Sequence, residues 1–438
     1  MKNKIGYQIY LRMRNMDNQN TRVKHKKLYD TSIVAEHVSS ILKESGMNFA
    51  NYVLKNNARL NKPMDFDTAY SLGVFTLYPY YLPLRDSKDL SAVFGKPEIA
   101  KVQAIAVLSS IYNKCMNESD GAAEQLAGIT AAVIDHDIGN APYGFIPLAK
   151  IPSVADNCGT GGDTIPTFHV SSASGILAAT MGLVVAKHGS PGNTRKSGSS
   201  DFIGSFNIDT FAPPSRIIKS LQKTNFGYIE ALDTRYKVIH VQTHHFSEIA
   251  HMNDIIGPMT NPVDPSKLTI KLIGTNQVLP PKVIANAYVI LNKLGVTNVR
   301  NGMAVKGYGK SESEKNLTMD EISTLKGGTE AVAFGPKGTE ELMLGYEDFG
   351  LARPSEVNEI SPPEGSSARI QFTNKVLEGK SNEGATNLLL ANTAMLIALR
   401  KGSVDSLYDS MEIARSALNN CDYRGLLRRV ATIAPKPV

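Results

Sequence analysis

The sequence contains no tryptophan and only three cysteines among its 438 residues. Cys115, Cys158 and Cys421 are odd in number and far apart in the chain. This spacing argues against a disulfide framework and against a cysteine-based metal site, and it favours a reducing, cytoplasmic setting. No apolar run approaches the roughly 18–20 residues of a membrane-spanning helix, and the first ten residues are too polar for a secretory signal. We therefore expect no membrane partner.

Charge of one sign is in excess only at the N-terminus. The net charge of the chain is +6, while hydrophobic residues make up 42% and charged residues 20% of the sequence. Residues 1–30 contain eight Lys or Arg residues and two Asp residues, so this arm carries the whole excess. A basic arm can bind nucleic acid, but Ile5, Tyr7, Ile9 and Leu11 alternate with other residues as they do in a strand. We favour an added edge strand or a solvated extension, and nucleic acid remains the alternative partner.

The remaining chain divides into a helical part and an α/β part. Apolar residues recur at helix spacing from residue 31 to residue 150. From residue 151 to residue 438 strands and helices alternate, with strands expected at 183–187, 268–274 and 299–305. Helices are expected at 172–181, 281–294, 387–399 and 404–418. The predicted fold is α/β, with an N-terminal helical domain before a larger domain that has a central, mostly parallel sheet. A short part of 210–255 is assigned either to this domain or to the helical one.

A glycine-rich segment is the strongest chemical signal in the chain. Asp156-Asn-Cys-Gly-Thr-Gly-Gly-Asp163 places three glycines around a threonine, and glycines let backbone N–H groups approach an anion closely. Three hydroxyls follow in Thr167-Phe-His-Val-Ser-Ser172, at the expected start of a helix, where anions are favoured. Lys187-His-Gly189 and Lys196–Asp201 add cations and further hydroxyls. A tight structural turn is the alternative for the first segment alone, but together the segments predict a site for a phosphorylated ligand.

Two adjacent acids lie later in the chain, at Asp320 and Glu321 within Thr318-Met-Asp-Glu-Ile-Ser323. Carboxylate oxygens are suitable ligands for Mg²⁺ bound to a diphosphate. Adjacent acids are also common in solvated loops, which is the alternative interpretation of this pair. A further segment, Asn253–Pro262, contains a Gly-Pro turn.

In this order, these segments resemble the anthranilate phosphoribosyltransferase family, which is structurally related to pyrimidine nucleoside phosphorylases. Tyr346–Leu351 and the helix that contains Asn392-Thr-Ala are also similar to that family, and the resemblance runs from about residue 30 to residue 430. It implies a magnesium-dependent glycosyltransferase that moves a 5-phosphoribosyl group from phosphoribosyl pyrophosphate (PRPP) to an aromatic amine, by default anthranilate, in tryptophan biosynthesis. It also implies a homodimer formed through the helical domain.

The resemblance carries over to individual residues. It implies that Asp163 and Lys187 are catalytic and that Asp320, Glu321 and Ser171 hold Mg²⁺. The predicted substrate-binding residues are Gly159, Thr160, Gly161, Gly162, Asp163, Thr167, His169, Ser171, Ser172, Lys187, His188, Gly189 and Ser199.

The sequence departs from the family pattern at three places. His169 stands where the family has asparagine, and Ser190-Pro191 stands where it has Asn-Arg. The region Val241–His251 lacks the arginine that holds the carboxylate of the acceptor in the family. Arg235, His244 and His245 are the candidate replacements, although adjacent histidines seldom bind one metal ion. The acceptor is thus the open part of the prediction.

Two other functions remain in competition. The first is a nucleoside or nucleotide phosphorylase of the same fold, which the glycine-rich loop would serve equally well but which Asp320 and Glu321 disfavour. The second is a paralogue of reduced activity that binds nucleic acid through residues 1–30.

Overall fold

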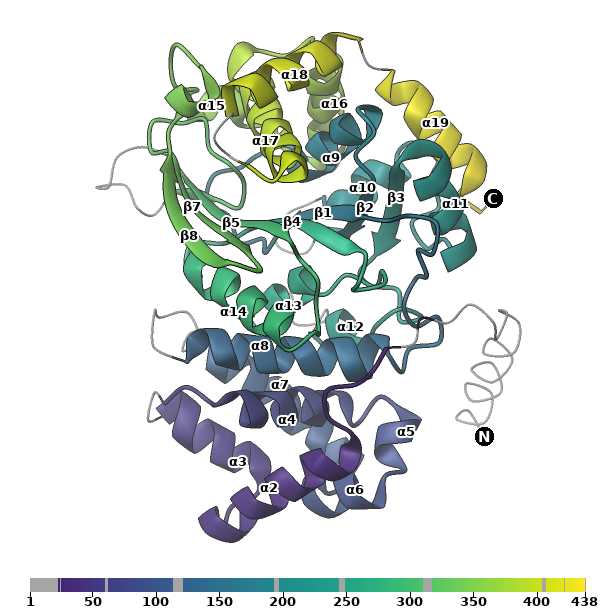
Figure 1. Cartoon of the computed structure of the whole chain (residues 1–438), viewed down its shortest axis with the longest axis vertical. Coiled ribbons are helices and arrows are strands. Elements are labelled where there is room, and N and C mark those ends of the chain that lie inside the picture. The colour runs from purple at the N-terminus through teal and green to yellow at the C-terminus, as the bar shows by residue number, and fades with distance from the viewer. Residues whose placement is uncertain are drawn as a thin grey trace.

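The computed structural model describes residues 23, 25–59, 62–112, 121–192, 197–243, 249–309, 317–403, 407–420 and 422–437 (Figure 1). The strand predicted within residues 5–11 lies outside this part of the chain. A stack of helices forms one half of the molecule in Figure 1, and a sheet covered by helices forms the other half. In the part that is described, no helix combines the length and the apolar character that crossing a membrane would require.

The first helices form the helical domain. Asp30 begins α2 (Thr31–Ser45) because its side chain accepts hydrogen bonds from two backbone N–H groups of the first turn, and Gly46 ends it at a φ of 66°. The other elements are α3 (Phe49–Val53), η1 (Leu54–Arg59), α4 (Phe66–Leu77), α5 (Leu82–Arg85), α6 (Lys88–Phe94), α7 (Pro97–Tyr112), α8 (Ala122–Ala132) and the π-helix η2 (Val133–Ile138).

The second half is built on one mixed sheet. Within the described residues its strand order is β3-β2-β1-β4-β5-β7-β8, with β6 paired to β5. The first five strands in this order are parallel, whereas β6, β7 and β8 are antiparallel. The strands are β1 (Val154–Gly159), β2 (Val185–Gly189), β3 (Phe226–Glu230), β4 (Leu268–Gly274), β5 (Asn301–Tyr308), β6 (Thr318–Met319), β7 (Thr329–Gly335) and β8 (Gly338–Leu344).

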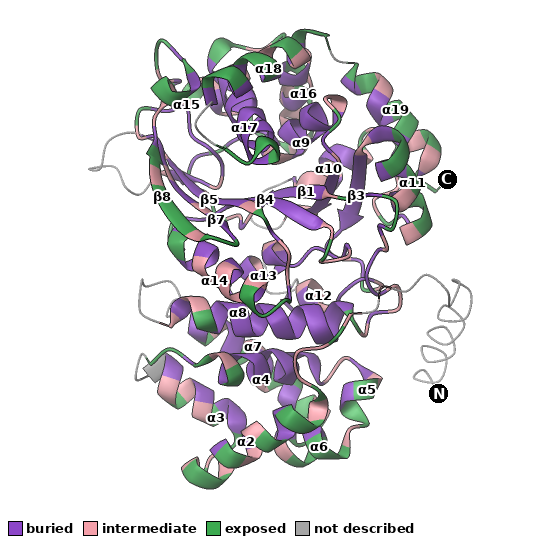
Figure 2. Ribbon diagram, viewed as in Figure 1, coloured by how far each residue is buried: buried purple, intermediate pink, exposed green. Residues whose placement is uncertain are grey.

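Helices cover both faces of this sheet, as the buried parallel strands require. On one face lie α9 (Val170–Thr180), α17 (Glu383–Lys401) and α18 (Leu407–Asn420), and Figure 2 shows that α17 is buried between its neighbours. On the other face α14 (Pro281–Lys293) packs against β5 and β7 and also against α8 of the helical domain. The remaining helices are α10 (Ser199–Gly204), α11 (Pro214–Thr224), α12 (Ile239–Thr243), α13 (Asn253–Met259), η5 (Tyr346–Phe349), α15 (Val357–Ile360), α16 (Ser366–Leu377) and α19 (Tyr423–Ile433).

One hydrophobic core joins the helical domain to the sheet. It includes Leu72 and Val107 from the helical domain, Ile255 from α13, Tyr288 from α14 and Ile273 from β4. The buried carboxylate of Asp137, in η2, also accepts hydrogen bonds from the backbone N–H groups that begin α12. The two halves therefore share packing and polar contacts along their boundary.

The predicted elements agree with this fold in type and approximate position. The expected strand at 268–274 coincides with β4, and the other two strands begin two residues later than expected. The parallel strands β1, β2 and β4 all end at one edge of the sheet, with Gly159 beside Gly274. Because ligands of α/β folds bind at this edge, the loops that follow these strands are placed to form a site.

Candidate active site

A cavity of about 350 Å³ lies at the carboxyl edge of the parallel strands. Most of the residues predicted from the sequence line it. They are Gly159, Thr160, Gly161, Gly162, Asp163, His169, Ser171, Ser172, Lys187, His188, Gly189, Ser199, Asp320 and Glu321. Thr167 lies just outside the lining, where its hydroxyl is 3.4 Å from Glu321 Oε1.

The glycine-rich loop and the late acid pair form one interlocked unit. The N–H of Gly161 donates to Asp320 Oδ2 at 2.8 Å, and the N–H of Asp320 donates to Asp163 Oδ1 at 2.9 Å. Gly159 has to be glycine because a Cβ there would lie 1.8 Å from Asp320 Oδ2. Gly161 adopts a φ of 69°, which glycine accommodates without strain. One of the amides predicted to bind diphosphate therefore orients an acid of the metal site.

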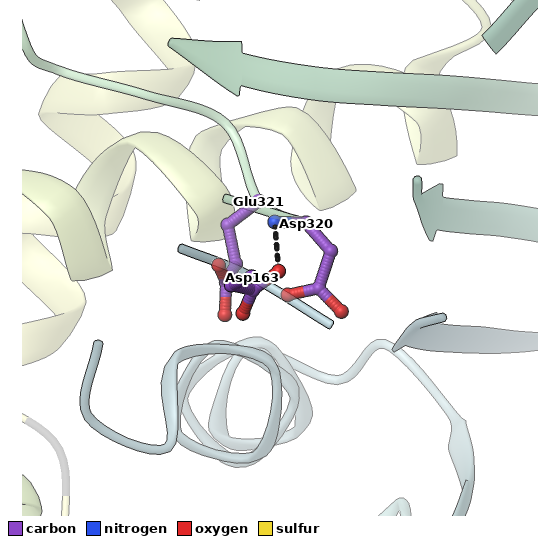
Figure 3. A group of neighbouring side chains, drawn as sticks. All are labelled: Asp163, Asp320 and Glu321. Carbon is purple, nitrogen blue, oxygen red and sulfur yellow. Dashed lines mark hydrogen bonds between the residues drawn. The ribbon is translucent and has the colours of Figure 1, made fainter. Parts of the chain in front are cut away.

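Three carboxylates gather at this point (Figure 3). One oxygen from each of Asp163, Asp320 and Glu321 lies within 4.8 Å of the others, and the side chains come from two segments about 160 residues apart. Like charges so close together repel unless a cation or protons compensate them. A set of hard oxygen donors fits Mg²⁺ by its chemistry, since this ion binds proteins through a few carboxylates and keeps waters or phosphate oxygens as its other ligands.

A buried cation lies on another wall of the cavity. Lys187 is 1% exposed, and its Nζ donates to the backbone oxygen of Asn157 at 2.7 Å and to Ser171 Oγ at 3.2 Å. Burial lowers the pKa of this ammonium group, while neighbouring acidic groups oppose the shift. Ser171, the third predicted metal ligand, is thus held by Lys187. Ser172 is fully enclosed, and its Oγ has no hydrogen-bond partner among the described residues.

His169 occupies the N-cap position of α9. Its ring stacks on Phe202 of α10, with centroids 5.1 Å apart, and its Nε2 lies 3.2 Å from Ser197 Oγ. Its backbone N–H donates to Thr373 Oγ1 of α16 at 3.2 Å. The histidine therefore connects the two loops that follow β1 and β2, through contacts on three different elements.

His188 is neutral at ordinary pH. Burial, together with Lys237 and other nearby cationic side chains, lowers its pKa well below the usual value. Its backbone N–H donates to Asp156, which forms a buried ion pair with Lys271 at 2.6 Å. The Nε2 atom has no hydrogen-bond partner within the described residues, so it is available to a ligand. His188 is therefore suited to hydrogen bonding and not to an ion pair with a carboxylate.

The residues predicted to bind the acceptor are not assembled in this cavity. Arg235 donates to Asp233, to the hydroxyl of Tyr143 and to the backbone oxygen of Phe211, and it is not among the described lining residues. His244 and His245 lie outside the residues that the structure describes.

Three side chains that the sequence did not single out also line the cavity. His240 lines the cavity with its ring centroid 6.0 Å from that of His188, and Asp254 lines it from α13. Burial raises the pKa of Asp254 to about 6. Tyr112, at the end of α7, lines the cavity from the helical domain, and its hydroxyl accepts a hydrogen bond from Asn276 Nδ2 at 3.0 Å. These groups add hydrogen-bonding side chains and a carboxyl group to the cavity.

Sequence reasoning missed several lining residues, including Tyr112, His240, Asp254, Asn276 and Arg369. Asn276 could have been found, because it follows the end of a predicted strand. Asp254 falls inside a segment that had been singled out for its Gly-Pro turn. Tyr112 and Arg369 belong to helices that carry no recognisable motif, and no signal in the sequence marks them.

Comparisons with known proteins show to which family the chain belongs. The model of the glycosyl transferase family, a/b domain, matches residues 151–422. The anthranilate phosphoribosyltransferase of Petrotoga mobilis is 30% identical over 272 residues, which are 60% of this chain and 71% of that protein. The enzyme of the same name from Methanosphaera stadtmanae is 27% identical over 320 residues, which are 70% and 83% of the two chains.

Solved structures agree on the fold. The anthranilate phosphoribosyltransferase of Saccharomyces cerevisiae in complex with PRPP and magnesium superposes with a TM-score of 0.60 at 20% identity, over 92% of this chain and 97% of that chain. The same enzyme in complex with 4-fluoroanthranilate gives a TM-score of 0.61 over 92% and 99% of the two chains, also at 20% identity. The family model covers more than half of the chain, and the matched segment contains the whole glycine-rich loop and both late acids. The chain therefore belongs to the anthranilate phosphoribosyltransferase family of glycosyltransferases and is a phosphoribosyltransferase enzyme.

Proposed function

We propose that this enzyme transfers the 5-phosphoribosyl group of PRPP to an aromatic amine in a magnesium-dependent reaction that releases pyrophosphate. Anthranilate is the default acceptor, which would place the reaction in tryptophan biosynthesis. The observation that carries the proposal is the pair of hydrogen bonds that join the glycine-rich loop to the acid pair, from Gly161 to Asp320 and from Asp320 to Asp163. The names of the relatives and the ligands of the yeast enzyme support it.

The chemistry requires a leaving group to be stabilised. The bond between C1 of the ribose and the diphosphate oxygen lengthens, and negative charge accumulates on the diphosphate. Mg²⁺ held by Asp163, Asp320 and Glu321 would neutralise part of this charge. The interlocked loop fixes these acids before substrate binds, so that little reorganisation is needed during the reaction.

The neighbouring wall would hold the phosphates of the donor. Ser171 and Ser172 lie in the first turn of α9, where N–H groups and the helix dipole favour an anion. The free hydroxyl of Ser172 is a donor that such an anion would satisfy. Lys187 orients Ser171 and adds positive charge beside it.

The acceptor needs orientation more than activation, because an aromatic amine is already a nucleophile. His188, His240 and Asp254 line one part of the cavity and would align it by hydrogen bonds. The new bond joins the amine nitrogen to C1, and the nitrogen then loses one proton. The carboxylate of Asp254 is suited to accept that proton, since its pKa is about 6.

The proposal is tested by measuring pyrophosphate release from PRPP with anthranilate while Mg²⁺ is varied. We expect release to require both the amine and the metal, and to stop when a chelator is added. Replacing Asp320→Asn should weaken the apparent Mg²⁺ affinity by about 10–100-fold or more, because loss of even an outer-shell partner of a metal has an effect of this size. Glu341→Gln is the matched control, because Glu341 is an exposed acid on β8 that pairs with Lys282. Pyrophosphate release that ignores Mg²⁺ would contradict the proposal.

A phosphorylase is the second candidate function, and the acid cluster argues against it because phosphorolysis has no diphosphate to bind. Loss of base from a nucleoside in phosphate buffer, with no turnover of PRPP, would favour the phosphorylase over the transferase. Binding of nucleic acid through residues 1–30 is tested separately, by comparing the salt-dependent affinity of the full chain with that of a chain lacking them.

We also propose a homodimer formed through the helical domain. Ile99 and Val102 of α7 are 55% and 69% exposed, and Ile33 of α2 is 46% exposed. Exposed apolar side chains on two helices of this domain suit a protein interface. Sedimentation equilibrium should give twice the mass of the chain, and a single-chain mass at micromolar concentration would refute the dimer.

A further inference from the structure

Helix α16 lies far along the chain from the phosphate-type motifs, yet it reaches the cavity. Arg369 of α16 lines the cavity, and its guanidinium donates to the backbone oxygen of Ser197 at 2.7 Å and to that of Phe168 at 3.4 Å. Thr373, one turn later, accepts the backbone N–H of His169. The helix therefore contacts the loop that begins α9 and the loop that begins α10 at the same time.

These two loops carry the hydroxyls of the cavity. Ser171 and Ser172 belong to the first turn of α9, and Ser197 and Ser199 lie at the beginning of α10. Ser172 is 1% exposed, lines the cavity, and its Oγ has no hydrogen-bond partner among the described residues. A buried hydroxyl without a partner, at the N-terminus of an 11-residue helix, indicates a bound acceptor of hydrogen bonds, and an anion suits that position.

The cavity contains side chains of both charges. Among the lining residues described, the acids are Asp163, Asp320 and Glu321 of the proposed metal site and Asp254 of α13, while Lys187 and Arg369 are the lysine and the arginine. Burial lowers the pKa of Lys187, whereas an arginine keeps its charge at any physiological pH. Two of the hydrogen bonds of Arg369 go to neutral carbonyl oxygens, and they fix the position of its guanidinium.

We propose that Arg369 binds the phosphomonoester of the sugar substrate at the N-terminus of α9 and thereby makes the cavity select ribose 5-phosphate groups over unphosphorylated ribose. This inference rests on the proposed function and adds to it a specificity residue that no sequence motif marks. A planar guanidinium is suited to the oxygens of a phosphate, and its contacts with Ser197 and Phe168 place it before substrate arrives. The proposal also explains why α16 is anchored to both loops.

The test measures binding of ribose 5-phosphate, with ribose as the uncharged probe, to the full chain by titration calorimetry. Wild-type protein should bind ribose 5-phosphate with an affinity that falls as salt is added, and Arg369→Gln should weaken this binding about 10–100-fold, the effect expected from a lost charged hydrogen bond. Arg369→Lys should fall between the two, because it keeps the charge but not the planar geometry. In turnover, Arg369→Gln should raise KM for PRPP more than it lowers kcat.

Two controls separate this role from a structural one. Arg400 of α17 also donates to a backbone oxygen, that of Met181 just beyond the other end of α9, so Arg400→Gln should leave the affinity unchanged. Thr373→Val removes the contact of α16 with His169 without removing a charge, and it should not abolish the salt dependence. The inference is overturned if wild type fails to bind ribose 5-phosphate. It is also overturned if Arg369→Gln or Arg369→Lys binds it as tightly as wild type, or if ribose and ribose 5-phosphate lose affinity equally.

Failure of this inference is distinguishable from failure of the proposed function, because the binding of ribose 5-phosphate needs neither the acceptor nor the metal. Binding that depends on Arg369, without turnover of PRPP by any aromatic amine, would refute the transferase and keep the inference. Turnover of PRPP with an unchanged KM in Arg369→Gln would support the transferase and refute the inference.

Discussion

Replacing Lys271 by methionine tests how much a buried ion pair next to the cavity stabilises the fold. Lys271 and Asp156 are both fully buried, and Lys271 Nζ lies 2.6 Å from Asp156 Oδ2. The ammonium group also donates to the backbone oxygen of Pro258 at 2.7 Å and lies 3.2 Å from Cys158 Sγ. Burial alone would lower the pKa of Lys271, but Asp156 and other nearby groups outweigh it and raise the pKa. Lys271 is therefore charged at neutral pH.

The magnitude follows from the geometry. At an effective dielectric constant of about 20, unit charges separated by 2.6 Å attract by about 6 kcal/mol. Desolvation of both ions offsets much of this attraction, but removing one partner leaves the other charge buried and typically costs about 3–5 kcal/mol. We expect Lys271→Met to lower the free energy of unfolding by that amount. At about 2 °C per kcal/mol for a domain of this size, Tm falls by roughly 6–10 °C.

The assay is thermal and denaturant unfolding at neutral pH, followed by circular dichroism. The double variant Lys271→Met with Asp156→Asn removes both charges and keeps an oxygen for the N–H of His188. It should recover about 2 kcal/mol of the loss.

Two results would refute this reasoning. The first is a Lys271→Met variant within about 1 kcal/mol of wild type, which would mean that the pair contributes no more than an exposed one. The second is a double variant that is as unstable as the single one, which would assign the effect to packing and not to the orphaned charge.

Three further predictions concern single side chains. Gly159→Ala should reduce kcat/KM for PRPP at least about tenfold, because its Cβ would lie 1.8 Å from Asp320 Oδ2. The control is Gly204→Ala, where the nearest atom to the new Cβ is 4.0 Å away. Equal kinetics for both variants would contradict the assignment. Burial raises the pKa of Glu230 to about 7 from 4.5, so wild type loses stability as pH rises through that window. In denaturant unfolding, the advantage of Glu230→Gln in free energy of unfolding should therefore grow between those pH values by about 1–3 kcal/mol, and a constant difference would exclude the mechanism. Asp137→Asn should lower the free energy of unfolding by about 1.5–3 kcal/mol, because the carboxylate accepts hydrogen bonds from two backbone N–H groups at 2.7 and 2.9 Å. An unchanged midpoint in denaturant unfolding would show that the amide replaces the carboxylate.

Much of the fold followed from local patterns. The burial of β4 agrees with the four apolar residues Leu268, Ile270, Leu272 and Ile273, and the two prolines at 280 and 281 mark the start of α14 because proline suits a first helical turn. Element boundaries were less certain, since α9 begins two residues before its predicted start. The strand pairing, in which β7 and β8 run antiparallel beside five parallel strands, depends on contacts between segments far apart in the sequence.

The donor half of the site could be predicted because its residues are contiguous. Asp163 lies in a loop, Ser171 in the first turn of α9 and Lys187 in β2, and their sequence neighbours also belong to the site. Once the strands are known to be parallel, their carboxyl ends must meet, and the motifs meet with them.

The sequence by itself determined the chemistry of the glycine-rich loop and of the acids at 320 and 321, because glycine, serine and carboxylate side chains have few other reasons to occur in that pattern. Tertiary structure alone decided what faces them. Arg369, Asp254 and Tyr112 come from three separate helices, and His240 comes from a fourth. Such side chains carry no shared spacing in the chain, so only the packing of the helices on the sheet and on one another brings them to one cavity.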